Sequence, residues 1–267
     1  MNSKKVSIVI PTFNRAKYLM ECIDSCLAQT VDCEIIVCDH GSTDNTPNAI
    51  KVYGNKIKYI RRELDSGVHF CWLDGILHAT NDLIHLNFDD DWIEPTFVEA
   101  CLKLFTEEVG CVFTDAKIFF ENENRSADAG FNFQKNTGIF DSKQLAKFNY
   151  GRLTSPGAGI FRKKIMIDNL FVGNVPFAKS IYHGVGPDVL FSLMSTIEYP
   201  KYGFVNKPLA VFRAHDNSIT IDAMNDKGKH LKIKNAYQEA RTFYFLSKFN
   251  TKLLRYKLFR KLLIQKK

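Results

Sequence analysis

Three consecutive carboxylates, Asp89, Asp90 and Asp91, are the residues of this sequence with the clearest capacity for chemistry. They follow residues 82–88, an apolar run that is typical of a buried strand. Adjacent carboxylates repel one another, so they are costly to hold together unless they are well solvated or bind a cation. Hard cations such as Mg²⁺ and Mn²⁺ favour oxygen ligands and usually retain waters and substrate phosphates. The triplet therefore predicts a divalent-cation site that receives a diphosphate; the alternative is an exposed acidic turn.

A further carboxylate, Asp39, ends the apolar run at residues 34–39, and small polar residues follow it at 40–46. A carboxylate at the end of a strand can accept a hydrogen bond from a base N–H or a ribose hydroxyl, and small residues let backbone N–H groups approach a ligand. This loop predicts nucleotide binding. The alternative is an ordinary helix-capping loop, a purpose that Asp44 and Thr46 would also serve.

The elements expected to position these groups alternate along the chain between β-rich runs and helical patterns. Strands are expected at residues 6–11, 34–39, 57–61, 82–88 and 110–120. Helices are expected at residues 17–27, 47–53, 68–79 and 95–107. This order predicts an α/β fold with right-handed crossovers and a mainly parallel central sheet flanked by helices. Ligands of such sheets bind beyond the carboxyl ends of the strands, where both acidic loops are expected.

Several motifs of other enzyme classes are absent from the sequence. There is no G-x-x-x-x-G-K-[ST] loop and no G-x-G-x-x-G after the first expected strand. P-loop NTPases and dinucleotide-dependent dehydrogenases therefore lose their main support. A G-x-S-x-G nucleophile elbow is absent as well.

The composition is that of a globular chain, since 45% of the 267 residues are apolar and 24% are charged. No apolar run approaches the ~20 residues that cross a bilayer. Behind Lys4 and Lys5 the apolar run covers only residues 6–10, shorter than a signal-peptide core of ~7–15 residues. The seven cysteines include no C-x-x-C pair and are expected to be small buried hydrophobic residues. These features predict a cytoplasmic protein without a transmembrane helix.

Three segments resemble, in this order, successive motifs of the family 2 glycosyltransferases, whose fold is called GT-A. The segments are SIVIPTFNR at 7–15, IVCDHGSTDNT at 36–46 and DDDWIEP at 89–95. The resemblance covers roughly residues 5–220. It implies an enzyme that transfers a sugar from a nucleoside-diphosphate donor, a UDP-sugar above all, to an acceptor hydroxyl with inversion at the anomeric carbon.

The resemblance also implies roles for individual residues. The nucleotide would be bound by Pro11, Thr12, Asn14, Arg15, Asp39, Asp89 and Asp90. Asp91 would bind Mn²⁺ or Mg²⁺, and Asp89 and Asp91 keep a D-x-D spacing. In the segment at 211–220, His215 would also bind the metal or the diphosphate. The donor or acceptor would be supported by Trp92, Gly157 and Arg213.

The segment GPDVLF at 186–191 looks like the G-E-D motif of the same family, with Pro187 in place of the usual Glu. The remaining carboxylate, Asp188, would be the general base. An inverting displacement needs one carboxylate to take the acceptor proton, while the metal offsets the charge on the departing diphosphate. The alternative is that Asp188 only caps a helix, since apolar residues follow it at helical spacing.

The basic charge is concentrated at the C-terminal end. Residues 227–267 hold 13 Lys and Arg and one acidic residue, whereas the rest of the chain holds 23 basic and 28 acidic residues. From Tyr244 on, apolar residues recur at steps of three or four: Leu246, Phe249, Leu253, Tyr256, Phe259 and Leu263. Such a basic amphipathic helix is expected to lie on an anionic membrane surface. A helix packed on the body is the alternative, and nucleic-acid binding is not favoured because no such motif is present.

Taken together, these features predict a GT-A domain at residues 1–225, with a nucleotide-binding half at 1–120 and an acceptor-binding half at 121–225. Residues 226–267 would form the basic helical extension. The expected function is a metal-dependent inverting glycosyltransferase, peripheral on the inner face of the cell membrane. Its acceptor would be a surface polysaccharide or a lipid-linked oligosaccharide.

Two alternatives remain open on the sequence. A sugar nucleotidyltransferase would carry a Gly-rich loop with Arg or Lys after the first strand, which residues 13–15 do not supply. A catalytically silent nucleotide-sugar-binding subunit is indicated by Phe88, where the family often has Asp, and by Pro187.

Overall fold

The structure is a computed structural model that describes residues 6–151, 154–173, 175–176, 178–179, 185–216, 218 and 226–264. At residues 150, 151 and 251–264 it describes the backbone alone. The strands are β1 (Val6–Thr12), β2 (Cys33–Asp39), β3 (Lys58–Arg61), β4 (Leu83–Leu86), β5 (Trp92–Ile93), β6 (Val109–Phe120), β7 (Arg125–Asp128), β8 (Gly138–Asp141), β9 (Gly159–Arg162) and β10 (Lys201–Ala214). The α-helices are α1 (Ala16–Leu27), α2 (Thr46–Ala49), α3 (Val68–His78), α4 (Phe97–Leu102), α5 (Ser142–Gly151), α6 (Lys163–Asn169), α7 (Pro187–Glu198) and α9 (Lys227–Ile264). Short 3-10 helices are η1 (Ile50–Lys56), η2 (Glu121–Glu123) and η3 (Pro156–Ala158).

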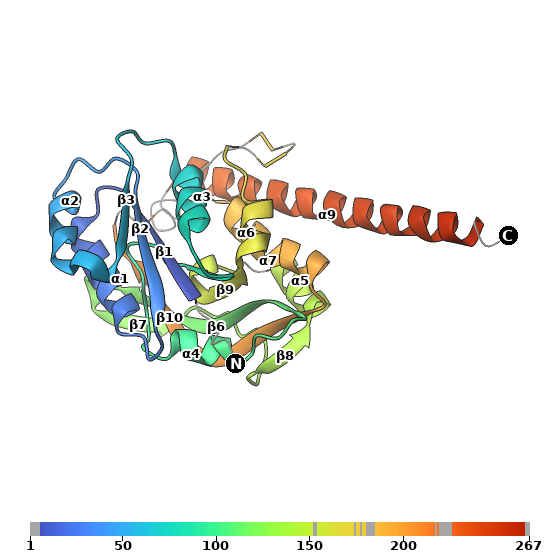
Figure 1. The fold of residues 1–267 in the computed structure, drawn as a ribbon, viewed down its shortest axis with the longest axis horizontal. Helices are drawn as coiled ribbons and strands as arrows, with labels where there is room; N and C mark the ends of the chain where they lie inside the picture. Colours follow the sequence, from blue (N-terminus) through green and yellow to red (C-terminus); the bar gives the residue numbers. More distant parts are fainter. Residues whose placement is uncertain are drawn as a thin grey trace.

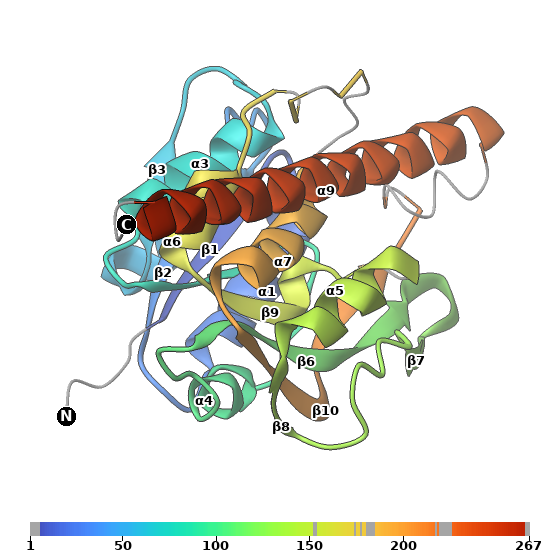
Figure 2. The same cartoon turned by 90° about the vertical axis from the view of Figure 1, so that its right-hand side faces the viewer.

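The described strands form one sheet with the order β3-β2-β1-β4-β9-β6-β10-β5, while β7 pairs with β6 and β8 pairs with β10. Strands β3, β2, β1 and β4 run parallel, and so do β6 and β10. Strand β9 is antiparallel to both of its neighbours, β4 and β6. Helices cover both faces (Figures 1 and 2). The predicted α/β fold with helices on both faces is confirmed, and its sheet, expected to be mainly parallel, is mixed.

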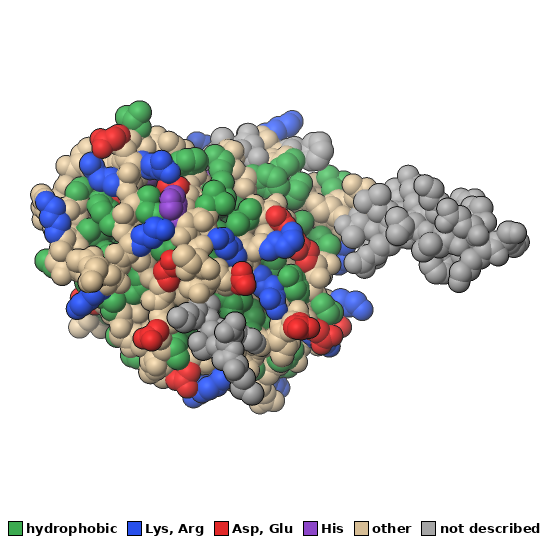
Figure 3. All heavy atoms as spheres, in the orientation of Figure 1, with side chains coloured by type: hydrophobic (Ala, Val, Ile, Leu, Met, Phe, Trp, Pro, Cys, Tyr) green, Lys and Arg blue, Asp and Glu red, His purple; other side chains and the backbone are tan. Residues whose placement is uncertain are grey.

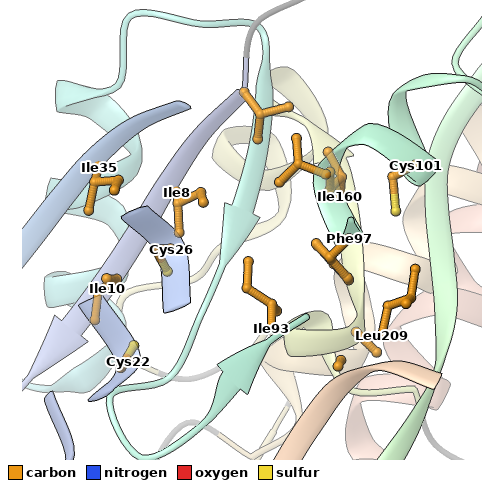
Figure 4. Packing of buried hydrophobic residues seen from close by; sticks show 14 of the residues in the cluster. Ile8, Ile10, Cys22, Cys26, Ile35, Ile93, Phe97, Cys101, Ile160 and Leu209 are labelled. Carbon is orange, nitrogen blue, oxygen red and sulfur yellow. The ribbon is translucent and has the colours of Figure 1, made fainter. Parts of the chain in front are cut away.

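The two faces of the sheet bury different side chains because successive strand residues point to opposite sides. On one face Ile8 and Ile10 of β1 pack with Cys22 and Cys26 of α1 (Figure 4). On the other face Val9 packs in a cluster that includes side chains of α3, α6 and α7. All seven cysteines are free thiols and six of them are buried, which confirms their interpretation as small hydrophobic residues.

Some predicted elements end early for local reasons. The strand expected to reach residue 88 stops at Leu86, although the N–H of Asn87 still donates to Val9 O at 2.9 Å. The chain then turns, with the N–H of Asp91 donating to Phe88 O at 3.0 Å. This turn takes the three aspartates out of the sheet at its carboxyl edge. The helix expected at 95–107 is the shorter α4.

The predicted C-terminal helix is present as α9. Its first turns pack against α7, where Ala240 and Tyr244 are buried in a cluster with Val189, Leu190 and Leu193. The helix then continues beyond the body of the molecule (Figure 1). The side chains of Leu253, Tyr256, Phe259 and Leu263 lie outside those that the structure describes. Within the described part of the chain, no helix has the length and apolarity needed to cross a membrane.

Candidate functional site

The carboxyl ends of β1 and β4 bring the acidic turn beside the loop that follows β1. These strands are parallel neighbours, so their ends lie at the same edge of the sheet. Thr12 Oγ1 donates to Asp89 Oδ2 at 2.7 Å. The Arg15 guanidinium hydrogen-bonds Asp90 and lies 3.6 Å from Asp89 Oδ1. Two of the predicted nucleotide-binding segments therefore meet in space. Pro11 is a buried strand residue whose register partner is Cys38.

The loops after β1 and β2 are joined through Asn14, which adopts a left-handed backbone conformation with φ of 55°. Its side-chain Oδ1 accepts from the N–H groups of Thr43 at 2.7 Å and Asp44 at 3.2 Å. Its own N–H donates to Ser42 Oγ at 2.9 Å. Asn tolerates this conformation better than most residues because its short polar side chain bonds locally. Asn14 thus shapes the loop expected to receive the nucleotide.

Asp39 is buried at the end of β2 and is already bonded to the protein. Its Oδ1 accepts from the N–H groups of Gly41 at 3.2 Å and Ser42 at 2.8 Å. Its Oδ2 accepts from the Tyr59 hydroxyl at 2.6 Å and lies 3.6 Å from Arg61 Nε. The carboxylate therefore holds the shape of the loop, and Tyr59 is a site residue that the sequence analysis missed.

The three aspartates of the turn differ in the direction in which their pKa values are shifted. Burial, followed by the nearby charge of Asp90, raises the pKa of Asp89 to about 7. The same two causes raise the pKa of Asp91 well above its ordinary value. Burial acts to raise the pKa of Asp90 too, but hydrogen bonding to His215 and the charge of Arg15 bring it below the ordinary value. The neutral forms of Asp89 and Asp91 are therefore favoured in the protein alone, and a bound cation would favour their ionised forms.

The end of β10 and the residue that follows it contact the acidic turn. The N–H of Arg213 donates to Asp91 Oδ1 at 2.9 Å, and its Nε donates to Asp90 O at 3.1 Å. His215 Nε2 lies 3.1 Å from Asp90 Oδ2. The Arg213 guanidinium also lies over the ring of Trp92, 4.8 Å from its centroid. The backbone turn that carries the aspartates is therefore fixed by a strand more than a hundred residues further along the chain.

Tyr18 is another site residue that the sequence analysis missed. Its ring packs on His215 with the centroids 4.8 Å apart, and its hydroxyl donates to Glu121 Oε2 at 2.8 Å. The Arg213 guanidinium lies 5.0 Å from the same ring. Tyr18 lies in the first turn of α1, directly after the loop of Arg15. This position close to Arg15 in the sequence could have identified Tyr18 as a site residue.

Gly157 of η3 and helix α7, which carries Asp188, belong to the second half of the chain. A Cβ on Gly157 would lie 3.1 Å from the ring of Phe212 and 3.7 Å from Phe88, so η3 packs closely on the residue that precedes the acidic turn. Thr154, just before η3, donates to Ser192 of α7 at 2.9 Å. Helix α7, whose first turn carries Asp188, is thereby tied to the segment that leads into η3.

The carboxylate of Asp188 accepts hydrogen bonds on both oxygens. Oδ1 accepts from the N–H groups of Gly186 and Val189, each at 2.8 Å. Oδ2 accepts from the Tyr237 hydroxyl of α9 at 3.1 Å. Burial raises the pKa of Asp188 to about 6, against the lowering effect of these donors. A carboxyl with this pKa is a proton acceptor near neutral pH.

The acidic turn has the donor chemistry for a divalent cation, although no three His, Cys, Asp or Glu side chains of the described residues form a ready-made metal cluster. Mg²⁺ and Mn²⁺ sites for nucleotide substrates commonly use one or two carboxylates and complete the shell with phosphate oxygens and water. Asp89 and Asp91 are buried carboxylates whose pKa values are raised, first by burial and then by the charge of Asp90. These residues fit such an ion.

Similarity to known proteins extends over most of the chain. The sequence model described as "Glycosyl transferase family 2" matches residues 7–170. The chondroitin synthase of Pasteurella multocida (strain Pm70) is 40% identical over 114 residues, which cover 41% of this chain and 12% of that protein. Glycosyltransferase GlyG of Streptococcus pneumoniae serotype 4 is 25% identical over 236 residues, covering 81% of this chain and 73% of that protein.

Solved structures share the fold. S. aureus TarS in complex with UDP-GlcNAc superposes with a TM-score of 0.63 at 19% identity, covering 80% of this chain and 60% of that one. The mannosyltransferase PcManGT from Pyrobaculum calidifontis, in complex with GDP-Man and Mn²⁺, gives a TM-score of 0.55 at 15% identity, covering 96% and 82%. The family match extends over more than half of the sequence, and the chain therefore belongs to glycosyl transferase family 2.

Proposed function

We propose that this protein transfers a sugar from a UDP-sugar to a hydroxyl of a saccharide acceptor, with inversion at the anomeric carbon. The observation that carries the proposal is the meeting of Thr12, Arg15 and the acidic turn with Arg213 and His215 at the carboxyl edge of the sheet. Carboxylates, an arginine and an imidazole lie there within hydrogen-bonding reach of one another, which supports a site for a diphosphate and its metal.

The donor and acceptor classes draw support from the similar proteins. TarS has been solved with UDP and with UDP-GlcNAc, and two of the matching synthases are named for chondroitin and hyaluronan. The chain spans only 12% of the length of those two synthases, so the synthesis of a surface polysaccharide or a lipid-linked oligosaccharide is part of the proposal.

In this proposal Asp39 accepts a hydrogen bond from the uracil base. A carboxylate offers about four lone-pair sites, so Oδ2 can accept from Tyr59 and from one further donor. Asn14 and the loop after β2 frame the nucleotide, and Arg15 lies beside the carboxylates that would receive its ribose and diphosphate.

A divalent ion held by Asp91, with Asp89 and His215 beside it, would stabilise the negative charge that builds on the departing diphosphate. Arg213 keeps the Asp90 and Asp91 turn in place through its main-chain and side-chain donors. The solved mannosyltransferase that contains Mn²⁺ supports a divalent ion here.

Asp188 acts as the general base in the proposed reaction. It takes the proton of the acceptor hydroxyl while that oxygen forms a bond to C1 of the sugar. The C1–O bond to the diphosphate breaks, and its electron pair leaves with the diphosphate on the opposite face. With a pKa of about 6, Asp188 is ionised at neutral pH and ready to accept this proton.

The basic helix α9 is proposed to hold the protein on the inner, cytoplasmic face of an anionic membrane. Large apolar side chains of its described part are exposed: Leu231, Phe245, Leu246 and Phe249. Lys and Arg interleave with them, a combination that favours binding to an anionic interface. Docking would bring the site near a lipid-linked acceptor.

The deciding experiment is a transfer assay with a panel of UDP-, GDP-, dTDP- and CMP-sugars, run with Mn²⁺, with Mg²⁺ and with excess EDTA. We expect turnover with a UDP-sugar, its loss in EDTA and its return when the metal is restored. Asp91→Asn should be inactive while it stays folded. Donor binding without any transfer or hydrolysis would instead identify a catalytically silent subunit, and full turnover in excess chelator would remove the metal from the proposal.

A further inference from the structure

The N-terminal half of helix α9 packs against the part of the structure that carries Asp188. The close approach occurs at Gly186, which has a φ of 103° and where a Cβ would lie 3.0 Å from the carbonyl oxygen of Ala236. Arg241 Nε donates to Asn149 O at 3.0 Å, which ties α9 to α5. The Tyr244 hydroxyl lies 3.1 Å from Thr196 Oγ1 of α7. These contacts fix the helix against α5, α7 and Gly186.

The Tyr237 hydroxyl stands out among these contacts because it reaches a titratable group. It donates to Asp188 Oδ2 at 3.1 Å, the oxygen that the backbone leaves available. The other oxygen, Oδ1, is held by the N–H groups of Gly186 and Val189. Two amides and one phenol, from two distant parts of the sequence, therefore fix the plane of the carboxylate.

We propose that Tyr237 is a positioning residue for the general base: its hydroxyl orients the Asp188 carboxylate toward the acceptor and favours the ionised form that takes the proton. This inference rests on the proposed role of Asp188. It also gives the C-terminal helix a function in catalysis that is separate from membrane binding.

The surroundings explain why this single donor matters. Asp188 lies where burial disfavours its charged form, so each donor to the carboxylate offsets part of that cost. Backbone N–H groups donate from the first turn of α7 and from the preceding segment, and the Tyr237 hydroxyl donates from α9. The charged group of α9 that faces Tyr237 is Arg241, whose Nε donates to Asn149 O. Burial raises the pKa of Tyr237 well above its ordinary value, so its hydroxyl keeps its proton and remains a donor.

The test compares two Tyr→Phe variants of the same helix in the full-length protein. Tyr237→Phe removes the donor to Asp188 and keeps the ring. Tyr244→Phe removes another hydroxyl from the same α7–α9 interface. The described hydrogen bonds of that hydroxyl are with Thr196 and Lys248.

Hydrogen bonds to charged groups are strong enough to change a proton equilibrium by roughly tenfold. For Tyr237→Phe we therefore expect the acidic limb of the kcat/KM–pH profile to move up by about one pH unit, with an unchanged KM for the donor.

The direction of the shift follows from which form the hydroxyl stabilises. Removing a donor to the carboxylate raises the pKa of Asp188, so the ionised base is lost at a higher pH. Tyr244→Phe should keep the wild-type profile even if its thermal stability falls. If Tyr237→Phe does not fold, replacement of Tyr237 by 3-fluorotyrosine keeps the shape and makes the hydroxyl a stronger donor. That replacement should move the acidic limb to lower pH.

Identical pH profiles for the wild type, Tyr237→Phe and the fluorinated protein would overturn the inference, as would equal shifts in Tyr237→Phe and Tyr244→Phe. Asp188→Asn separates this failure from that of the proposed function. If Asp188→Asn is inactive and the Tyr237 variants are unchanged, the base assignment stands and only the positioning role fails. If Asp188→Asn is fully active, the base assignment itself is wrong.

Discussion

At the scale of single residues, the three consecutive aspartates show how identical side chains acquire different properties. Asp89 accepts from Thr12, Asp90 is held by Arg15 and His215, and Asp91 accepts from a backbone N–H of β10. Burial and the charge of Asp90 raise the pKa values of Asp89 and Asp91, whereas hydrogen bonds with His215 and Arg15 and the charge of Arg15 lower the pKa of Asp90. A metal on the acidic turn would therefore compete with protons at Asp91 and Asp89 before it disturbed Asp90.

Asp188→Asn keeps the shape of the base but removes its ability to take a proton. We expect kcat to fall by about 10²–10⁴-fold with little change in donor affinity. In the wild type, activity should be lost as the pH falls through about 6, because protonation of Asp188 removes the base. Steady-state kinetics between pH 5 and 8 on both proteins measure this. A variant that loses UDP binding while keeping kcat would make Asp188 a structural residue.

Asp39→Ala should weaken the binding of UDP by ~1–3 kcal/mol, since a base N–H would be left without its acceptor. The affinity for Mn²⁺ with inorganic diphosphate should change less, because the metal and the diphosphate would bind at the acidic turn and not at Asp39. Tyr59→Phe is the matched control, since it removes a present partner of Asp39 and leaves the carboxylate in place. Calorimetry that finds equal UDP binding in Asp39→Ala and the wild type would contradict the role of Asp39 at the base.

At the scale of elements, α3 lies unusually close to the sheet. Gly75 of α3 has no Cβ, and one added there would lie 2.4 Å from Val9 Cγ1 and 2.8 Å from Cys38 Sγ. The helix can therefore approach β1 and β2 only because this position is glycine. Strand β1 leads into the loop that carries Asn14 and β2 ends at Asp39, so this packing helps to fix the side of the site that is proposed to bind the nucleotide.

Gly75→Ala should destabilise the fold by ~1–3 kcal/mol, the range typical of an overpacked core. Urea unfolding measures the change in the free energy of unfolding. Val9→Ala removes the methyl group nearest the added Cβ, so the double variant should be less destabilised than the sum of the two single changes. Strict additivity of the two single effects would mean that the helix relaxes away from the strand without strain.

At the scale of the whole molecule, the distribution of charge separates the body from the C-terminal helix. Positive and negative side chains are interspersed over the face of the body in Figure 3. In contrast, residues 227–267 carry 13 Lys and Arg and one acidic residue. Tyr244 is fully buried, whereas Phe245, Leu246 and Phe249, which follow it, are exposed. Among the described side chains, the packing of α9 on α7 thus ends near residue 245.

Deletion of residues 246–267 should leave a folded protein that binds donor but no longer sediments with anionic liposomes. The cut keeps Tyr237 and Tyr244, which pack on α7. Full-length protein should bind less at higher salt, because screening acts over ~8 Å at physiological ionic strength. Zwitterionic liposomes are the control. An unfolded truncated protein, or full-length protein that ignores anionic liposomes at low salt, would contradict the membrane role.

The sequence by itself determined the parallel β-α-β half of the fold and the edge where the site lies. Apolar alternation and turn residues are local signals, and the strands of 6–12 and 33–39 were predicted within a residue or two. The acidic turn was predicted as a unit because its residues are contiguous. The match of three ordered motifs gave the family, which the comparison over residues 7–170 confirms.

Only the tertiary structure decided which distant residues meet at that edge. Arg213 and Asp91 lie 122 positions apart, and Tyr237 and Asp188 lie 49 apart on different helices. The antiparallel insertion of β9 between β4 and β6 likewise depends on which strand edges remain available once the first four strands have paired. No local pattern encodes such contacts, because they depend on how whole elements bury their apolar faces against one another. The partners of Asp39, Asp188 and Asp91 are therefore properties of the packed fold, whereas the carboxylates themselves are properties of the sequence.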